Sequence, residues 1–374
     1  MKHKLRIGVL FGGRSAEHEV SLVSAASVIR ALDKEKYEII PIGITPQGKW
    51  LSFLGVLDLM KSGSGTNRLP EKLLLPDPQY KGLVEIGRDS SSSLRLDVIF
   101  PLLHGTYGED GTVQGLFELS NIPYVGAGVL GSAAGMDKVV AKQLFRQSGI
   151  PVVPDVWFLA ADFKRKRKQI LQEIERKLRS PYFVKPANLG SSVGISKAHT
   201  RKELEDAIVL ASKYDRKILV EQSIEHAREI EVSVLGNDEP AASLPGEIIP
   251  SNEFYDYDAK YIDGKSTAII PAKLSRRVIK RIQSYAELAF LAIDCAGMAR
   301  VDFLVQKETD KIFLSEINTI PGFTSISMYP KLWEASSIPY PKLLDRLIEF
   351  AIERHREKSK LRTTFKSKKN WYRS

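Results

Sequence analysis

One stretch near the C-terminal end decides the fold, residues 299–325, which read ARVDFLVQKETDKIFLSEINTIPGFTS. Arg300 and Asp302 lie two residues apart in a segment where polar and apolar residues alternate, so a strand would place both on one face. Glu316 and Asn318 repeat this spacing after a polar turn segment. The sequence therefore predicts a β-hairpin, one face of which carries two carboxylates, an amide and a guanidinium.

The polar side chains on this face include hard oxygen ligands, which suit Mg²⁺ held jointly with substrate phosphates. An arginine beside them could meet negative charge that develops during a reaction. The alternative is a plain strand pair with one solvent-exposed face, because such strands also alternate polar and apolar residues. The Pro321-Gly322 turn that follows favours the metal and phosphate site, since it predicts a loop that approaches a ligand closely.

Length and composition indicate a chain of more than one domain. At 374 residues, with 43% hydrophobic and 27% charged residues, the chain exceeds a typical single core, so we expect two or three domains. No apolar run approaches a membrane span, and the N-terminal segment lacks the cleavage pattern of a signal peptide. A single cysteine, Cys295, excludes an intrachain disulfide and fits a reducing cytoplasm.

The formal charge of +10 invites a nucleic-acid-binding interpretation. Its distribution argues against one, because residues 358–374 contain seven Lys/Arg and no Asp/Glu, which leaves only +3 for the rest of the chain. We expect this segment to be a basic, disordered tail. A solvated tail accounts for the excess charge without a binding face on the folded part.

The first part of the chain predicts an α/β domain. Residues 5–11 have the pattern of a buried strand, a glycine pair turns the chain, and the next segment carries a helical apolar stripe. Strand, glycine turn and helix open a doubly wound fold, although the glycines do not match the dinucleotide fingerprint. A second glycine-rich loop, 104–111, follows the strand predicted at 97–103, at the sheet edge where such folds bind ligands. Serine-rich stretches within 45–95 predict exposed loops.

Other segments have features of a nucleotide and substrate site. The segment FVKPANLGSSVG puts Lys185 on a strand ahead of a Gly/Ser loop, whose backbone N–H groups can cradle phosphate; a hairpin with a glycine turn is an equal alternative. Glu221 ends a later strand where a nucleobase could bind. Glu229 and Glu231 alternate with apolar residues, which predicts a strand with a solvent-facing acidic side. Glu17 lies at a predicted helix start, where a carboxylate could cap the helix or hold a substrate ammonium.

Seven segments, in order along the chain, resemble the D-alanine–D-alanine ligases of the ATP-grasp superfamily: GGRSAEHEVS, HGTYGEDGTVQG, GMDK, FVKPANLGSSVG, EFYDYDAKY, ARVDF and EINTIPGFTS. The resemblance covers about residues 5–350, and the combination is specific although each motif alone is not. It implies a three-domain ATP-grasp ligase of α/β and α+β class. The parts implied are an N-terminal domain with a doubly wound parallel sheet at 1–127, a central subdomain at 128–225 and a C-terminal subdomain at 226–357. ATP would lie between two antiparallel sheets, and the loop 251–272 would close over the site.

The resemblance also implies the reaction. ATP phosphorylates the carboxylate of one D-alanine, and the amine of a second D-alanine attacks the acyl phosphate, giving D-alanyl-D-alanine for peptidoglycan precursors. The implied cofactors are ATP, two Mg²⁺ that Mn²⁺ can replace, and a monovalent cation such as K⁺. We further expect a cytoplasmic homodimer with no nucleic-acid partner and no membrane insertion.

Matching motif positions carry the family's site residues onto this chain. The metal ligands implied are the carboxylates and the amide of the hairpin, Asp302, Glu316 and Asn318. The groups implied at the acyl phosphate are Arg300 and the backbone of Gly322, and the group implied at the second substrate's carboxylate is Ser327. A hydrogen-bonded set around the first D-alanine is implied for Glu17, Ser191 and Tyr261. Nucleotide contacts are implied for Lys138, Lys185 and Lys260 at the phosphates and for Glu221, Ile224 and Glu229 at adenine and ribose.

Two questions remain open at the level of sequence. The DYDAKY segment around Tyr261 keeps the pattern of dipeptide-forming relatives, so we expect D-alanine rather than D-lactate as the second substrate. A different ATP-grasp ligase or kinase would share the nucleotide and metal residues but lack the set Glu17, Ser191 and Tyr261. A nucleic-acid-binding protein would instead interleave basic and aromatic residues across a folded face. The joint presence of that set favours the ligase.

Overall fold

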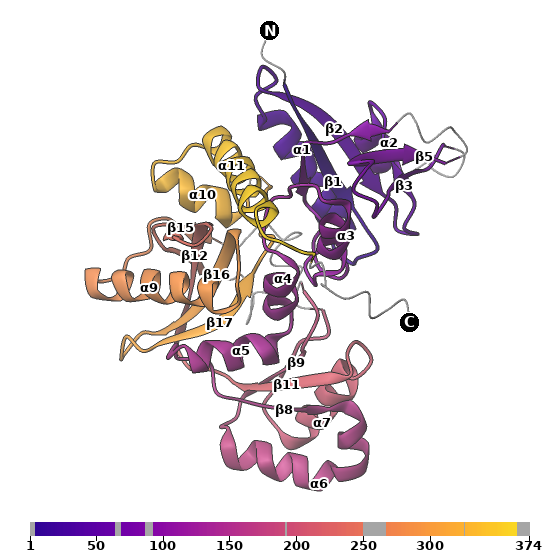
Figure 1. The fold of residues 1–374 in the computed structure, drawn as a ribbon. Coiled ribbons are helices and arrows are strands. Elements are labelled where there is room, and N and C mark those ends of the chain that lie inside the picture. The colour runs from indigo at the N-terminus through magenta and orange to yellow at the C-terminus, as the bar shows by residue number, and fades with distance from the viewer. Residues whose placement is uncertain are drawn as a thin grey trace, which may run out of the picture.

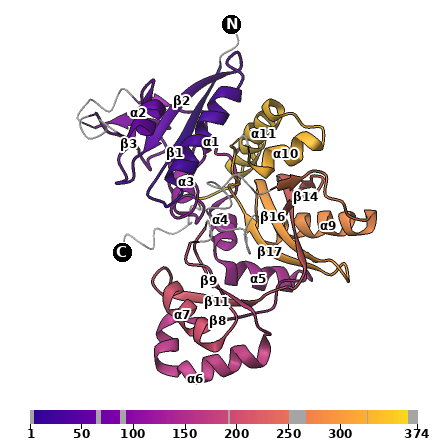
Figure 2. The same ribbon diagram turned by 180° about the vertical axis from the view of Figure 1, so that it is seen from behind.

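The computed structural model describes residues 4–63, 69–86, 93–190, 193–249, 267–324 and 326–364, to which all statements below refer. Within these ranges the chain forms three main sheets with packed helices and one small sheet (Figure 1). The N-terminal sheet lies at one end of the molecule and the sheet built around β8 to β11 at the other, which the view from behind repeats (Figure 2). None of the helices in the described ranges combines the length and the apolar character that crossing a bilayer demands.

The N-terminal sheet is parallel at its centre. Its elements are β1 (Leu5–Gly12), α1 (His18–Ala31), β2 (Tyr37–Ile44), β3 (Trp50–Leu51), α2 (Val56–Ser62), β7 (Val98–Pro101) and α3 (Thr112–Ser120). The strand order is β3-β2-β1-β7, in which only β3 is antiparallel to its neighbour. The central strand β1 is buried from Ile7 to Gly12, because helices cover both faces of such a sheet. A small sheet of β4 (Lys72–Leu74), β5 (Gly82–Glu85) and β6 (Leu94–Arg95) completes this part, and the predicted α/β organisation is confirmed.

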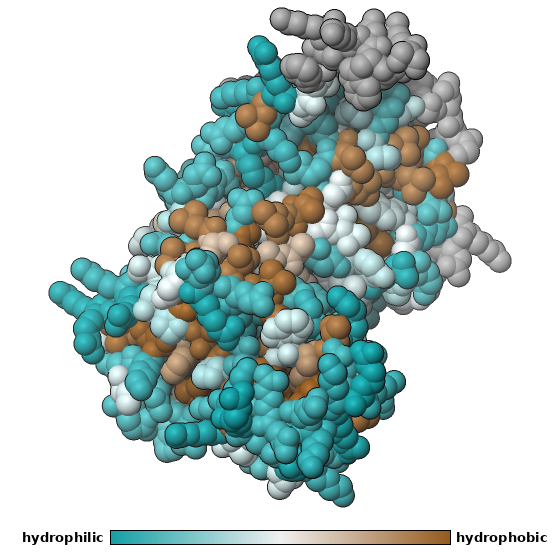
Figure 3. Space-filling view, turned by 60° about the horizontal axis from the view of Figure 1, so that its bottom comes forward, coloured by the Kyte–Doolittle hydropathy of each residue, from teal (hydrophilic) through white to brown (hydrophobic). Residues whose placement is uncertain are grey.

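The second sheet is antiparallel and has its helices on one face. It consists of β8 (Asp155–Leu159), β9 (Tyr182–Pro186), β10 (Ser196–Ala198) and β11 (Lys217–Gln222), in the order β10-β9-β11-β8, with α6 (Ala160–Lys177) and α7 (Arg201–Ala211). Val156, Val184 and Val220 pack against Ile174 and Leu204 of these helices. The outer face of α6 is exposed and basic, and the surface is mainly hydrophilic where this part comes forward (Figure 3).

Two helices connect the N-terminal sheet to the second sheet, α4 (Val129–Met136) and α5 (Lys138–Gln147). The boundary between them is fixed by Asp137, whose side chain accepts hydrogen bonds from the backbone N–H groups of Val139 and Val140 at 3.0 and 3.1 Å. The same carboxylate pairs with Lys217 of β11 at 2.5 Å. This contact anchors the start of α5 to the second sheet.

The C-terminal sheet is antiparallel throughout. Its strands are β12 (Ala227–Gly236), β13 (Ala241–Ala242), β14 (Gly246–Ile249), β15 (Thr267–Ile269), β16 (Gly297–Gln306) and β17 (Ile312–Asn318), in the order β15-β14-β12-β16-β17 with β13 paired to β12. One face packs against α9 (Arg276–Ala292) through Ile230, Val232 and Val301. Because side chains alternate along a strand, the opposite face carries the polar residues of β12 and β16.

Strands β16 and β17 form the predicted hairpin. Arg300 pairs with Asn318 and Asp302 with Glu316, but the register then shifts by one residue, so that Ser315 is an extra residue on β17. The bulge has a specific consequence for this sequence. Ile312 and Leu314 of β17 stand at even sequence positions, as do Glu316 and Asn318, so a regular strand would place all four on one face. By shifting the alternation, the bulge lets Ile312 and Leu314 enter the core while the polar pair faces the cavity.

The N-terminal sheet shares its core with two C-terminal helices, α10 (Met328–Ala335) and α11 (Tyr340–Ser359). The rings of Phe100 and Phe323 meet edge to face with centroids 5.8 Å apart. The hydroxyl of Tyr37 donates to Asp345 of α11 at 2.8 Å. Figure 1 shows α11 lying beside the N-terminal sheet, far in sequence from the strands it covers. The first and last parts of the chain therefore form one packed unit.

Helix α11 extends slightly further than expected. It ends at Ser359 and so includes the first two residues of the segment 358–374 expected to be a disordered tail. Its last turn also contacts α3, because the Lys358 ammonium lies 2.6 Å from the Glu118 carboxylate.

Candidate active site

A cavity of about 620 Å³ lies where the two antiparallel sheets face each other. Lys185 and Glu221 line it from the second sheet, and the polar face of the β16–β17 hairpin lines it from the C-terminal sheet. Glu17, from the N-terminal part, also borders it. All three parts of the molecule thus contribute to one cavity, at the place where the family resemblance implies ATP.

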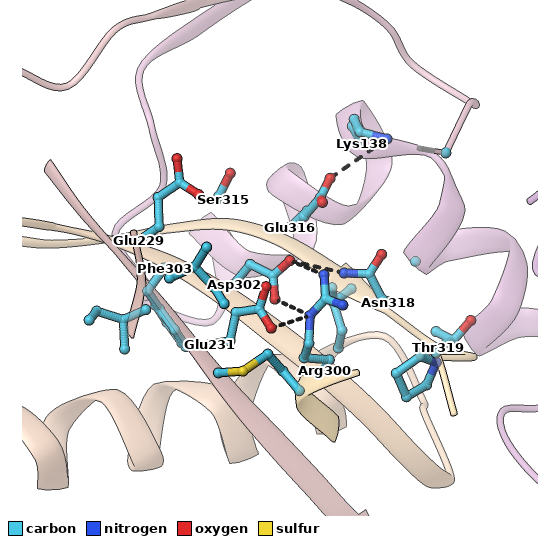
Figure 4. A pocket seen from close by; sticks show the side chains of 18 of the residues that line it. Lys138, Glu229, Glu231, Arg300, Asp302, Phe303, Ser315, Glu316, Asn318 and Thr319 are labelled. Atoms are coloured by element: carbon cyan, nitrogen blue, oxygen red, sulfur yellow. Dashed lines mark hydrogen bonds and ion pairs between the residues drawn. The ribbon is translucent and has the colours of Figure 1, made fainter. Parts of the chain in front are cut away.

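On the polar face of the hairpin, Arg300 contacts two carboxylates, that of Asp302 on the same strand and that of Glu231 on β12 (Figure 4). Its Nε and Nη2 donate to Asp302 Oδ1 and Oδ2 at 2.8 and 2.7 Å, and its Nε lies 3.1 Å from Glu231 Oε2. Asn318 Nδ2 donates to Asp302 Oδ2 at 3.1 Å. Burial by itself lowers the pKa of Arg300, but Asp302 and then Glu231 raise it well above its ordinary value. The guanidinium therefore keeps its charge at every working pH.

The three predicted metal ligands lie together on this face. Asp302 and Asn318 are hydrogen-bonded, and Glu316 pairs across the hairpin with Asp302 while its Oε2 lies 3.9 Å from Lys138 Nζ. Within the described ranges, no group of three His, Cys, Asp or Glu residues could hold a metal ion by itself. The donor set is two carboxylates and an amide. This hard-oxygen set fits Mg²⁺ in the common arrangement in which substrate phosphates and water supply the other ligands.

Glu231 is a site residue that sequence reasoning missed. The expectation that the acidic side of its strand faces solvent is wrong, because Glu229 and Glu231 both line the cavity. Glu231 stands directly opposite Asp302 in the β12–β16 pairing, and its side chain is only 7% exposed. Like charges at opposed positions repel, so Arg300 stabilises both carboxylates by contacting each of them. The available signal was the acidic repeat inside an otherwise apolar strand.

Two of the predicted phosphate-binding lysines lie at the cavity wall. Lys138, the first residue of α5, donates from Nζ to the Leu189 carbonyl oxygen at 2.8 Å. Lys185 Nζ lies 2.6 Å from Glu221 Oε2. Burial lowers the pKa of Lys185, but neighbouring carboxylates, Glu221 first, raise it overall. Burial also disfavours the charged form of Glu221 and so raises its pKa, but the charges of Lys142 and Lys185 lower this pKa to about 2. Both Lys185 and Glu221 are therefore ionised.

The remaining nucleotide and second-substrate residues within the described ranges also line the cavity. Ile224 follows β11 and Glu229 lies on β12, beside the hairpin. Ser327 precedes α10, and its Oγ accepts a hydrogen bond from the Thr324 backbone N–H at 3.0 Å. A Cβ at Gly322 would lie 2.7 Å from this Oγ, so the backbone approaches Ser327 as closely as it does because residue 322 is glycine.

Glu17 lies against two glycines from other segments. A Cβ at Gly105 would be 2.5 Å, and one at Gly190 2.8 Å, from Glu17 Oε2. Gly105 also has φ +71°, a conformation that favours glycine. The Glu17 side chain makes no capping hydrogen bond to α1, so of the two roles predicted for it the cap is not formed. Its buried carboxylate borders the cavity instead.

Glu109 and His104 connect the N-terminal glycine-rich loop to the segment after the hairpin. Glu109 Oε2 accepts from the Gly105 N–H at 2.7 Å, and Oε1 accepts from the Ile320 N–H at 3.1 Å. A ring nitrogen of the buried His104 lies 3.1 Å from the Ile320 carbonyl oxygen. Burial, followed by the charge of Glu17, raises the pKa of Glu109 to about 8. The sequence predicts no site role for Glu109 and a structural or exposed position for His104, although both belong to the glycine-rich loop 104–111.

Three predicted site residues, Ser191, Lys260 and Tyr261, lie outside the described residues. Thr267–Ile269 of the predicted closing loop 251–272 form β15, and residues 251–266 of it also lie outside the described residues. The roles implied for these residues stay predictions.

The fold and site define a class of enzyme. Two antiparallel sheets enclose a cavity that has lysines on one wall and a carboxylate–arginine hairpin on the other, which is the architecture of ATP-grasp ligases. Family models then specify the member. The model described as "D-ala D-ala ligase N-terminus" matches residues 6–127, and that described as "D-ala D-ala ligase C-terminus" matches residues 144–349. The chain belongs to the D-alanine–D-alanine ligase family.

Individual relatives match over nearly the whole chain. The D-alanine–D-alanine ligase of Caldicellulosiruptor bescii is 53% identical over 359 residues, which cover 96% of this chain and 98% of the relative. The structure is similar to the VanG D-Ala:D-Ser ligase from Enterococcus faecalis, with a TM-score of 0.83, 38% identity and coverage of 93% of this chain and 100% of that one. It is also similar to the D-alanine–D-alanine ligase from Coxiella burnetii, with a TM-score of 0.82, 42% identity and 96% coverage of both chains. The expected ATP-grasp fold is confirmed.

Proposed function

We propose that this protein joins two molecules of D-alanine into D-alanyl-D-alanine, a peptidoglycan precursor, while ATP is converted to ADP and phosphate. One observation carries the proposal: a charged hairpin face with Arg300 at its centre shares a cavity with the buried carboxylate of Glu17. The first feature suits phosphoryl transfer and the second suits an amino-acid ammonium group. Membership of the ligase family supports the same activity.

In the first step a carboxylate oxygen of one D-alanine attacks the γ-phosphorus of ATP. The bond from that phosphorus to the bridging oxygen breaks, and ADP and D-alanyl phosphate form. We assign Glu17 to the ammonium of this D-alanine, because its carboxylate faces the cavity. Lys138 and Lys185 are assigned to the ATP phosphates, where their charges offset the negative charge. Catalysis at this step is mainly positioning and charge neutralisation.

In the second step the neutral amine of another D-alanine attacks the acyl carbon. A tetrahedral intermediate forms, its C–O bond to phosphate breaks, and the amine proton is lost as the peptide bond is completed. We assign Arg300 and the Gly322 N–H to the oxyanion, and Ser327 to the carboxylate of the second substrate. Charged or oriented donors at a developing oxyanion supply a large part of such a rate enhancement.

We assign Mg²⁺ to Asp302, Glu316 and Asn318, on the chemistry of this donor set. When bound, the metal neutralises charge on the ATP phosphates. Asp302 would then serve both the metal and Arg300, and Glu231 would still pair with the guanidinium. We further propose that the enzyme binds a second Mg²⁺, that Mn²⁺ can replace Mg²⁺, and that a monovalent cation such as K⁺ also binds. We propose a homodimeric state and a cytoplasmic location as well.

We further assign Ser191 and Tyr261 to the hydrogen-bonded set around Glu17, Lys260 to the γ-phosphate, and Ile224 with Glu229 and Glu221 to adenine and ribose. Closure of the loop 251–272 would keep water from the acyl phosphate, which would otherwise hydrolyse. We also propose that the domains of the chain end at residues 127, 225 and 357.

The test measures phosphate release from ATP with candidate substrates supplied singly and in pairs. We expect release with D-alanine alone and none with L-alanine alone. Because a D-Ala:D-Ser ligase shares this fold, D-serine and D-lactate are each offered in competition with D-alanine at neutral pH. Predominant D-alanyl-D-alanine supports the proposed second substrate, and a predominant depsipeptide or D-alanyl-D-serine product refutes it. Absence of any D-alanine-dependent release would overturn the activity itself.

A further inference from the structure

A buried lysine stands behind the cavity wall without lining the cavity. Lys142, on α5, is 1% exposed. Lysine is almost never so deeply buried unless its charge is paired. Its Nζ donates to Glu221 Oε1 and lies 3.4 Å from Asp155 Oδ2. None of the roles assigned above uses this residue.

The lysine resolves a conflict within the second sheet. Glu221 of β11 and Asp155 of β8 are directly opposed in the antiparallel pairing, and both side chains are at most 5% exposed. Two buried carboxylates at opposed positions repel each other. Lys142 reaches both of them from α5, which lies between β17 and the second sheet (Figures 1 and 2).

The charges form a row that leads from the surface to the cavity. Arg146, one helical turn beyond Lys142, has a side chain that is 43% exposed and pairs with Asp155. Lys142 follows, then Glu221, and then Lys185 at the cavity wall. Signs alternate along the row, so each carboxylate is held by two cations. Glu221 is held through separate oxygens, Oε1 by Lys142 and Oε2 by Lys185.

The two cations on Glu221 differ in what else they can bind. Lys185 borders the cavity, so an ATP phosphate can draw its ammonium away from Glu221. Lys142 is buried and is not among the residues that line the cavity, so we expect it to keep its place when nucleotide binds. We propose that Lys142 is the positioning residue that makes the nucleotide site select adenine, by holding Glu221 as an oriented carboxylate. The inference rests on the proposed contact between Glu221 and adenine.

The selection follows from hydrogen-bond chemistry. An ionised carboxylate only accepts hydrogen bonds, so it suits the exocyclic amino group at C6 of adenine and repels the carbonyl oxygen at C6 of guanine. A protonated or turned carboxyl could instead donate to that oxygen. With Lys142 in place Glu221 can do neither, because its charge and one of its oxygens are fixed.

The test compares kcat/KM for ATP and for GTP in four variants of the full chain. Lys142→Met keeps the length of the side chain without its charge, and we expect it to lower the ATP/GTP ratio by about tenfold or more, through KM for ATP with kcat nearly unchanged. Arg146→Met is the matched control, because it lies on the same helix and in the same row without touching Glu221. We expect its ratio to equal that of the wild type.

Glu221→Gln distinguishes an error in the role proposed for Lys142 from an error in the proposed contact between Glu221 and adenine. If it lowers the ratio while Lys142→Met does not, the inference about Lys142 is wrong and the adenine contact stands. If it leaves the ratio unchanged, the adenine contact itself is wrong. The fourth variant combines Lys142→Met with Glu221→Gln. It removes both charges of the buried Lys142–Glu221 pair, so the test stays usable if Lys142→Met alone does not fold. A ratio equal to that of Glu221→Gln alone supports action through Glu221, and a further fall in the double variant refutes it.

Discussion

The pairing of Arg300 with Glu231 predicts the outcome of Glu231→Gln. Removing one partner of a buried ion pair costs about 3–5 kcal/mol when the other charge is left alone. Here Arg300 keeps its two hydrogen bonds to Asp302. The substitution also removes the repulsion between opposed carboxylates. We therefore expect the free energy of unfolding to fall by only about 1–2 kcal/mol.

The effect on catalysis should be larger than the effect on stability. Without the charge of Glu231, we expect the guanidinium of Arg300 to be drawn entirely to Asp302 and to leave the position proposed for it at the reacting group. A displacement of about 1 Å at such a group can cost about a hundredfold in rate, so we expect kcat to fall by about ten- to a hundredfold with KM for ATP little changed. Steady-state kinetics with ATP and D-alanine, beside urea unfolding, measure both quantities.

Glu247→Gln provides a matched control for this experiment. Glu247 pairs with Arg228 at 2.8 and 2.6 Å, its side chain is 12% exposed, and it does not line the cavity. We expect a similar loss of stability with an unchanged kcat. If Glu231→Gln behaves like this control, with stability reduced and kcat retained, Glu231 does not position Arg300 for the reaction.

Three further predictions concern other contacts. Asp302→Asn should impair activity far more than stability, lowering kcat by about a hundredfold or more, because it removes a proposed metal ligand; a preserved rate would exclude Asp302 from that role. Asp137→Ala should cost about 1–2 kcal/mol of unfolding free energy, since it removes the cap of α5 and the partner of Lys217, whereas Asp137→Asn should retain most of the cap; equal losses would contradict the capping contribution. Glu109, with its pKa raised from 4.5 to about 8, holds a proton in the folded protein that the unfolded chain releases. Wild-type stability should therefore fall as pH rises from about 5 to 8, by up to about 1.4 kcal/mol per pH unit, and Glu109→Gln should remove this fall; parallel pH profiles of urea unfolding would refute the shift.

The sequence predicts the polar residues of the hairpin but not the β-bulge that turns them toward the cavity. Spacing within each strand places Arg300 with Asp302 and Glu316 with Asn318, and the structure brings these pairs together. The bulge at Ser315 could not be predicted, because no local residue pattern requires it. It is needed because Ile312 and Leu314 on the core side occupy positions of the same parity as Glu316 and Asn318 on the cavity side, and only the paired sheet shows that these two pairs belong to opposite faces.

Glu231 and Lys142 show a second limit of sequence reasoning. Periodicity places Glu231 on the polar face of its strand but cannot tell a face that lines a cavity from one that meets water. Lys142 lies on a helix with other charged residues, where a lysine ordinarily points to solvent. Its burial follows from Asp155 and Glu221, two carboxylates that sequence separates widely and the second sheet brings opposite each other. The burial of Lys142 therefore depends on pairing between strands that are far apart in sequence.

The packing of α11 against the N-terminal sheet has a consequence for how the chain folds during synthesis. Tyr37 and its partner Asp345 are 308 residues apart in sequence. The apolar face that Leu343, Leu344 and Leu347 cover belongs to strands that leave the ribosome long before those leucines. Throughout translation of the ATP-binding part, that face stays open to water and to neighbouring nascent chains, the state in which proteins aggregate or are captured by chaperones. The first sheet to be synthesised is thus completed by one of the last helices.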